Sequence, residues 1–93
     1  MFDRELRRFR ESVRLGAYDI TSHGLDEMEE DGLSVLDLES CVLTGSIVQR
    51  QRDRRTGERK FVIEGRALNG RGMAVVAKSL AGGKLAALTV YRN

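Results

Sequence analysis

The sequence has few of the side chains that form covalent or metal-bound sites. Its 93 residues include one cysteine and one histidine. A single cysteine excludes an internal disulfide, and Cys41, on the apolar face of a predicted helix, is interpreted as a core residue. One imidazole, from His23, beside two exposed carboxylates is a weak ligand set for a metal. Gly82-Gly83 joins two predicted strands, so no phosphate-binding loop is indicated. We therefore expect no metal and no cofactor.

Long apolar runs are also missing. No stretch approaches the ~20 apolar residues that a membrane span needs. Residues 1–15, MFDRELRRFRESVRL, are charged throughout and contain no apolar signal core. The apolar fraction of 41% is enough for one modest hydrophobic core. We expect a single soluble, cytoplasmic domain that covers residues 1–93.

Basic residues are absent from one part of the chain. Residues 24–40 carry seven acidic residues and no lysine or arginine, so the rest of the chain has sixteen basic against seven acidic residues. Such a separation can steer a polyanion to one face of a protein and repel it from another. Charge runs are more often simply solvated faces, but the asymmetry makes nucleic acid a candidate partner.

An amphipathic helix is predicted in residues 1–15. Its apolar stripe has helical spacing and consists of Phe2, Leu6, Phe9 and Val13. Gly16 ends this helix, and residues 17–21 are expected to form a connector or a short edge strand.

Residues 20–45 are predicted to form a pair of helices. Thr21 or Ser22 can cap the first helix, and Gly32 closes it by accepting a left-handed backbone. Ser34, with an aspartate three residues later, has the spacing of a capping box and begins the second helix.

The hydrophobic period changes to that of strands in residues 46–92. Four strands are predicted, at 46–52, 59–68, 73–79 and 85–91. Helices followed by consecutive strands are typical of an α+β fold. We expect the helices to pack on one face of an antiparallel sheet of about four strands.

The registers of the last two hairpins follow from which residues can be buried. A two-residue turn after Leu68 would direct Glu64 and Arg66 into the core, where unpaired charge is costly. We therefore favour a three-residue loop at 69–71, with the pairs Arg66–Ala74, Glu64–Val76 and Val62–Lys78. A two-residue turn at 82–83 gives the pairs Val75–Val90 and Ala77–Leu88.

These registers gather polar side chains on the sheet face away from the helices. The expected group consists of Glu64, Arg66, Lys78, Thr89 and Tyr91. Two cations, a carboxylate and a phenol over small residues have the chemistry of a phosphodiester site. Catalysis at a phosphodiester needs a base, an acid and cations for the negative charge that develops on phosphorus.

Four residues are candidates for catalysis. His23 is the natural acid or base because histidine exchanges protons near neutral pH; local packing at a helix start is the alternative. Arg66 and Lys78 would hold the phosphate, or would pair with Glu64. Tyr91 would donate to the phosphate or stack on a base, unless it only packs. Further arginines would follow a nucleic-acid backbone, that of RNA if the site acts on RNA, or form a solvated hairpin: Arg50, Arg52, Arg54, Arg55 and Arg59.

Several stretches resemble a bacterial family, domain of unknown function 4258. They are TSHGLDEMEEDGLS, LESCVLTG, GERKFVIEG and LTVYR, all within residues 20–92. One departure is Lys60 after Arg59, where the family often has an aromatic residue. The resemblance implies the fold of RelE-like and MqsR-like toxins, small ribonucleases encoded beside an antitoxin. It also implies metal-independent cleavage of mRNA through the 2′-hydroxyl and a neutralising antitoxin as partner.

The expected function is therefore that of the toxin of a bacterial toxin–antitoxin pair. Two alternatives stay open. One is a non-catalytic module that binds nucleic acid through the basic surface. The other is a protein-interaction module that uses the acidic helix.

Overall fold

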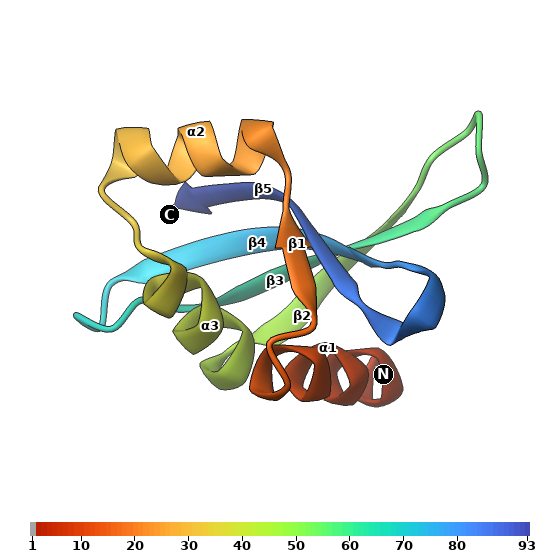
Figure 1. The fold of residues 1–93 in the computed structure, drawn as a ribbon, viewed down its shortest axis with the longest axis horizontal. Helices are drawn as coiled ribbons and strands as arrows, with labels where there is room; N and C mark the ends of the chain where they lie inside the picture. Colours follow the sequence, from red (N-terminus) through yellow and green to blue (C-terminus); the bar gives the residue numbers. More distant parts are fainter. Residues whose placement is uncertain (1) are drawn as a thin grey trace.

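Helices cover one face of a mixed β-sheet in the computed structural model, which describes residues 2–93 (Figure 1). The helices are α1 (Asp3–Arg14), α2 (Ser22–Asp31) and α3 (Val35–Thr44). The strands are β1 (Tyr18–Ile20), β2 (Ser46–Arg52), β3 (Arg59–Arg66), β4 (Gly72–Ser79) and β5 (Leu85–Arg92), in the order β1-β5-β4-β3-β2. Within the described range, no helix is long and apolar enough to cross a membrane.

The predicted α+β class is confirmed, with one more strand in the described part of the chain than the expected four. The extra strand is β1, which pairs in parallel with β5, so the sheet is mixed rather than purely antiparallel. The amphipathic helix predicted for residues 1–15 is α1, with Phe9 and Val13 buried. Met1 lies outside the described residues.

Local signals set the ends of α2 and α3 as the sequence predicts. The Thr21 hydroxyl accepts a hydrogen bond from the Gly24 N–H at 3.0 Å and caps α2. Gly32 ends α2 in the left-handed conformation, with φ 66°. Ser34 and Asp37 form the capping box of α3.

The hydrophobic core lies between the sheet and the helices, and α1 and α3 supply most of its helical residues. Its largest fully buried side chains include Phe9, Leu38, Ile63, Met73 and Leu85. Cys41 lies among them, and burial raises the pKa of its thiol to about 12. A thiol with this pKa stays protonated near neutral pH and is a poor nucleophile. The interpretation of Cys41 as a core residue is confirmed.

The β3–β4 register differs by two residues from the predicted one. Glu64, not Arg66, lies opposite Ala74. The loop has three residues, as expected, but it occupies 68–70, because Gly70 takes the left-handed position that ends such a loop, with φ 87°. Since side chains alternate with a period of two, the shift leaves every residue on its predicted face.

The β4–β5 register agrees with the prediction at one end only. Val75 lies opposite Val90, but Ala77 lies opposite Ala87 rather than Leu88. The extra residue on β5 is accommodated in a β-bulge. The turn between these strands has three residues (Ala81–Gly83) instead of the predicted two.

Helix α2 borders the sheet along the outer edge of β5, beyond the end of β1 (Figure 1). The backbone N–H groups of Val90 and Arg92 donate to the carboxylates of Glu27 and Asp31, each at 3.1 Å. The Thr21 hydroxyl donates to the carbonyl of Leu88 at 2.9 Å. Part of the acidic run therefore satisfies the unpaired backbone of a sheet edge.

Candidate nucleic-acid interface

The sheet face opposite α1 and α3, here called the open face, carries polar side chains over small residues. Glu64, Ala74 and Tyr91 lie in one row across β3, β4 and β5. Arg66 and Gly72 form the next row. The middle strand β4 has only small side chains here. The polar groups of Glu64, Arg66 and Tyr91 on the neighbouring strands therefore stand higher than the surface between them.

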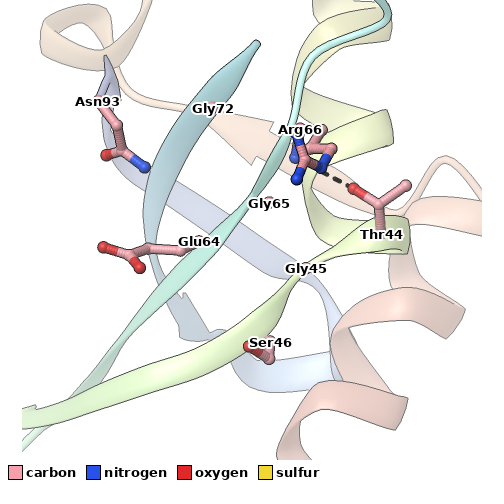
Figure 2. A pocket seen from close by; sticks show the side chains of 8 residues that line it. All are labelled: Thr44, Gly45, Ser46, Glu64, Gly65, Arg66, Gly72 and Asn93. Atoms are coloured by element: carbon pink, nitrogen blue, oxygen red, sulfur yellow. Dashed lines mark hydrogen bonds between the residues drawn. The ribbon is translucent and has the colours of Figure 1, made fainter. Parts of the chain in front are cut away.

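A hollow of about 360 Å³ lies at this end of the open face (Figure 2). Its lining consists of Thr44, Gly45, Ser46, Glu64, Gly65, Arg66, Gly72 and Asn93. In Figure 2 the side chains of Glu64 and Asn93 extend to the same side of the hollow, and Arg66 lies beside Thr44. The hollow is open and polar, which suits a charged, solvated ligand.

Two glycines bring α3 close enough to β3 to form this hollow. A side chain on Gly65 would collide with the carbonyl oxygen of Cys41, and one on Gly45 would collide with that of Glu64. The Thr44 hydroxyl then accepts a hydrogen bond from the Arg66 backbone N–H at 3.1 Å. The end of α3 thereby fixes the backbone that carries Arg66.

The polar groups of this face keep unused hydrogen-bonding capacity. Arg66 Nη1 donates to the Gly70 carbonyl at 3.0 Å, which orients the guanidinium and leaves its other N–H groups available. Within residues 2–93, Glu64 has no ion pair and the Tyr91 hydroxyl no hydrogen bond. A carboxylate, a guanidinium edge and a phenol are therefore free to contact a ligand.

Lys78 lies on the open face but at the other end of β4 from this hollow. Arg66 is opposite Gly72, and Lys78 is six residues further along the strand, or about 20 Å. The Lys78 ammonium pairs with Glu58 at 2.9 Å. The structure therefore does not bring Arg66 and Lys78 together around one phosphate. The partner of Lys78 is Glu58, not Glu64, the residue that the alternative interpretation paired with it.

His23 lies at the start of α2, outside the edge of β5. Its side chain is 70% exposed, and Nε2 is 3.3 Å from the Glu27 carboxylate, which also accepts from the Val90 N–H. The strands β5 and β4 separate it from β3, which carries Arg66. Of the four predicted catalytic residues, only Arg66 and Tyr91 lie in neighbouring rows of the sheet.

Two further polar residues lie near Arg66 and Tyr91 and are not among the four predicted catalytic residues. Glu64 is on the open face, as its alternation along the strand predicts. Asn93 reaches the hollow because the chain continues past β5, with its backbone N–H bonded to the Gly72 carbonyl at 3.3 Å. Its position depends on the β4–β5 pairing, which no local pattern around residue 93 specifies.

Three of the predicted RNA-binding arginines point away from the open face. Arg50 lies opposite Phe61 and Arg52 opposite Arg59, on the side of the sheet that carries the core. Arg54 lies in the turn between β2 and β3, where the Asp53 carboxylate accepts the N–H of Arg55 at 2.8 Å. The hairpin extends beyond the rest of the molecule (Figure 1).

The fold and this face define a small α+β domain with a polar, uncovered sheet surface. The chain belongs to the family described as a domain of unknown function (DUF4258), whose model matches residues 20–92. The resemblance to this family is therefore confirmed, and α1 lies outside the matched range. No curated protein and no solved structure matches the chain.

Proposed function

We propose that the protein is a metal-independent endoribonuclease that cleaves mRNA on the open face of its sheet. In this proposal it is the toxin of a bacterial toxin–antitoxin pair, acts in the cytoplasm and is neutralised by an antitoxin protein. The observation that carries the proposal is the unpaired Glu64 carboxylate, which lies in the same row as Tyr91 across Ala74 and one row from Arg66 on β3.

These three side chains supply the groups that RNA self-cleavage requires. The Glu64 carboxylate accepts the proton of the 2′-hydroxyl as its oxygen attacks phosphorus. Arg66 donates to the non-bridging oxygens, where negative charge develops. Tyr91 stacks on a base or protonates the departing 5′-oxygen. The bond from phosphorus to the 5′-oxygen breaks, which leaves a 2′,3′-cyclic phosphate and a 5′-hydroxyl.

His23 and Lys78 have no step in this mechanism. His23 is held by Glu27 outside the sheet edge, and Lys78 is paired with Glu58 at the far end of β4. We therefore expect His23→Ala to retain the cleavage rate of the wild type, in contrast to the role that the sequence alone suggests for this histidine.

An RNA cleavage assay with purified protein, free of antitoxin and in EDTA, tests the proposal. Glu64→Gln keeps the shape of the side chain but removes the base, so the rate should fall by about 10²- to 10⁴-fold. Arg66→Lys keeps the charge but loses the planar guanidinium that can bind two phosphate oxygens at once, so a smaller decrease in the cleavage rate is expected. Glu30→Gln, an exposed carboxylate on α2, is the matched control and should cleave normally.

Two results contradict the proposal. One is intact RNA after incubation with the wild type, and the other is Glu64→Gln cleaving as fast as Glu30→Gln. A substrate with a 2′-deoxy sugar at the cleaved position should resist the wild-type protein, because the internal nucleophile is missing.

A non-catalytic nucleic-acid-binding module is the second candidate. It is favoured by the exposed arginines on β2 and β3, which make no ion pair within residues 2–93. This candidate predicts salt-sensitive RNA binding without cleavage. The acidic helix is a weaker basis for a protein-interaction function, because Glu27 and Asp31 already bind the backbone of β5.

A further inference from the structure

A β-bulge in β2 turns the arginines of this strand toward the helix side of the sheet. Ser46 lies opposite Glu64 on the open face, and the register then shifts between Ile47 and Gln49. Without the extra residue, Arg50 would share the face of Ser46. With it, Arg50 lies opposite Phe61 in the core layer.

Arg59, which lies opposite Arg52, lines a second hollow of about 320 Å³ between α1 and the end of the sheet that carries Lys78. Its lining consists of Glu5, Arg8, Glu58, Arg59, Phe61, Lys78 and Ser79. Glu58 is neutralised by Lys78 at 2.9 Å. Arg8 and Arg59 are exposed and make no ion pair within residues 2–93, so their charge is available to an anion.

An aromatic side chain stands beside these cations. The Arg50 guanidinium carbon is 6.0 Å from the centre of the Phe2 ring. Phe2 is only partly buried and packs edge-on against Phe61, with ring centres 6.1 Å apart. Exposed arginines next to an aromatic ring are the combination that binds single-stranded nucleic acid, through phosphate contacts and base stacking.

We propose that Arg8, Arg50, Arg52 and Arg59, here called the arginine shelf, form a second binding site for single-stranded RNA. This inference rests on the proposed function, which makes RNA the substrate. The shelf and the open face lie on opposite sides of the sheet, and β2 is its outermost strand. An RNA strand that leaves the hollow beside Glu64 therefore reaches the shelf by passing around the edge of β2.

Two linked sites make affinity depend on RNA length. A short oligonucleotide occupies the open face or the shelf, whereas a longer one occupies both and gains from the high effective concentration of its second part. The shelf thus anchors a long substrate at a distance from the cleaved bond. An acidic peptide is the competing occupant, and it would leave RNA affinity independent of the shelf.

Fluorescence anisotropy with uncleavable 2′-O-methyl RNA tests the shelf separately from cleavage. Oligonucleotides of about 4 and about 16 nucleotides cover one site or both. The wild type should bind the longer RNA at least about tenfold more tightly, and Arg52→Glu/Arg59→Glu should lose most of this advantage. For the longer RNA, the slope of the logarithm of the binding constant against the logarithm of the salt concentration should become shallower by about 1.4, because two phosphate contacts are lost.

The matched control is Arg14→Glu/Lys84→Glu, which changes the net charge equally. Both residues are exposed, and Lys84 lies at the opposite edge of the sheet, near Asp19 of β1. The control should keep the length dependence, whereas Arg8→Glu, on a different element of the shelf, should reduce it.

Equal binding of the longer RNA by the shelf variant and the control overturns the inference. Absence of a length advantage in the wild type overturns it as well. If the wild type cleaves no RNA but shows the shelf-dependent length effect, the proposed endoribonuclease function fails and the second binding site stands.

Discussion

Single glycines determine how close α3 can lie to the sheet. A Cβ atom on Gly65 would collide with the Cys41 carbonyl and would lie 2.9 Å from the Gly45 Cα. Neither neighbour can move away alone, because both are backbone atoms of the helix end. The hollow beside Glu64 therefore depends on a residue that contributes no side chain.

We expect Gly65→Ala to destabilise the protein by about 1–3 kcal/mol, because the helix end must shift away from β3. Gly72→Ala is the matched control, since its Cβ would meet nothing closer than the Asn93 side chain at 3.4 Å. Urea unfolding followed by circular dichroism measures both. Equal stability of the Gly65→Ala variant and the wild type would show that the contact is not close.

Asp37 links α3 to the β3–β4 loop. Its carboxylate accepts the backbone N–H of Ser34 at 2.8 Å and that of Leu68 at 2.9 Å. The Ser34 bond, and then the Leu68 bond, lower the pKa of Asp37 below its usual value. The ionised form is therefore the one that stabilises the fold.

This shift predicts a pH-dependent effect of Asp37→Ala. A lowered folded pKa gives stability that is complete above the unfolded value of about 3.9 and is lost as the pH falls through the folded value. At pH 7 the variant should be about 1 kcal/mol less stable than the wild type. The difference should shrink in urea titrations below about pH 4, and a constant difference from pH 7 to pH 3 would argue against the carboxylate as its cause.

At the scale of elements, α2 acts as a cover for the edge of β5. A strand edge with free N–H groups is a template for pairing with another chain. Glu27 and Asp31, one helical turn apart, occupy the N–H groups of Val90 and Arg92. The acidic run thus protects the sheet, in addition to any effect on polyanions.

Removal of both carboxylates should expose this edge. For Glu27→Ala/Asp31→Ala we expect a loss of about 0.5–1.5 kcal/mol for each of the two hydrogen bonds, because water can reach the N–H groups that are released. Self-association at high protein concentration is expected too. Glu29→Ala/Glu30→Ala removes the same charge from the same helix without touching β5. Denaturant unfolding measures the stability of the two double variants, and light scattering measures their self-association. Equal stability and equal self-association of the two would mean that α2 does not protect the edge.

The sequence predicts the helix ends and the faces of β3 and β4 well, but not the registers or the bulges that reverse the faces of parts of β2 and β5. Thr21, Gly32 and Ser34 act through neighbours within a few residues, so local spacing is sufficient to place them. A two-residue slip between β3 and β4 leaves the buried face unchanged, so periodicity cannot detect it. The pairing of Glu64 with Ala74 therefore had to come from the structure.

At the scale of the whole molecule, the two sheet edges carry opposite charge. The acidic helix α2 lies along β5, and the arginine-bearing strand β2 forms the other edge (Figure 1). This arrangement would orient an approaching RNA toward β2. The separation of charge is visible in the sequence. The sequence does not show on which face of the sheet each cation lies, because a single bulge residue in β2 determines this for the arginines of that strand.

The candidate site was therefore only partly accessible from the sequence. Arg66 and Tyr91 were predicted on the correct face, because burying an arginine without a partner is costly. His23 and Lys78 were grouped with them from chemistry and an approximate register. In the structure His23 lies outside a sheet edge and Lys78 at the far end of a strand, which depends on long-range pairing.

The most direct test of this account is the identity of the ends that the purified wild-type protein leaves on RNA in the presence of EDTA. Mass spectrometry of the fragments should show 2′,3′-cyclic phosphates and 5′-hydroxyls, and the fragments should be nearly absent with Glu64→Gln. Intact RNA, or fragments with 3′-hydroxyl and 5′-phosphate ends, would contradict the account.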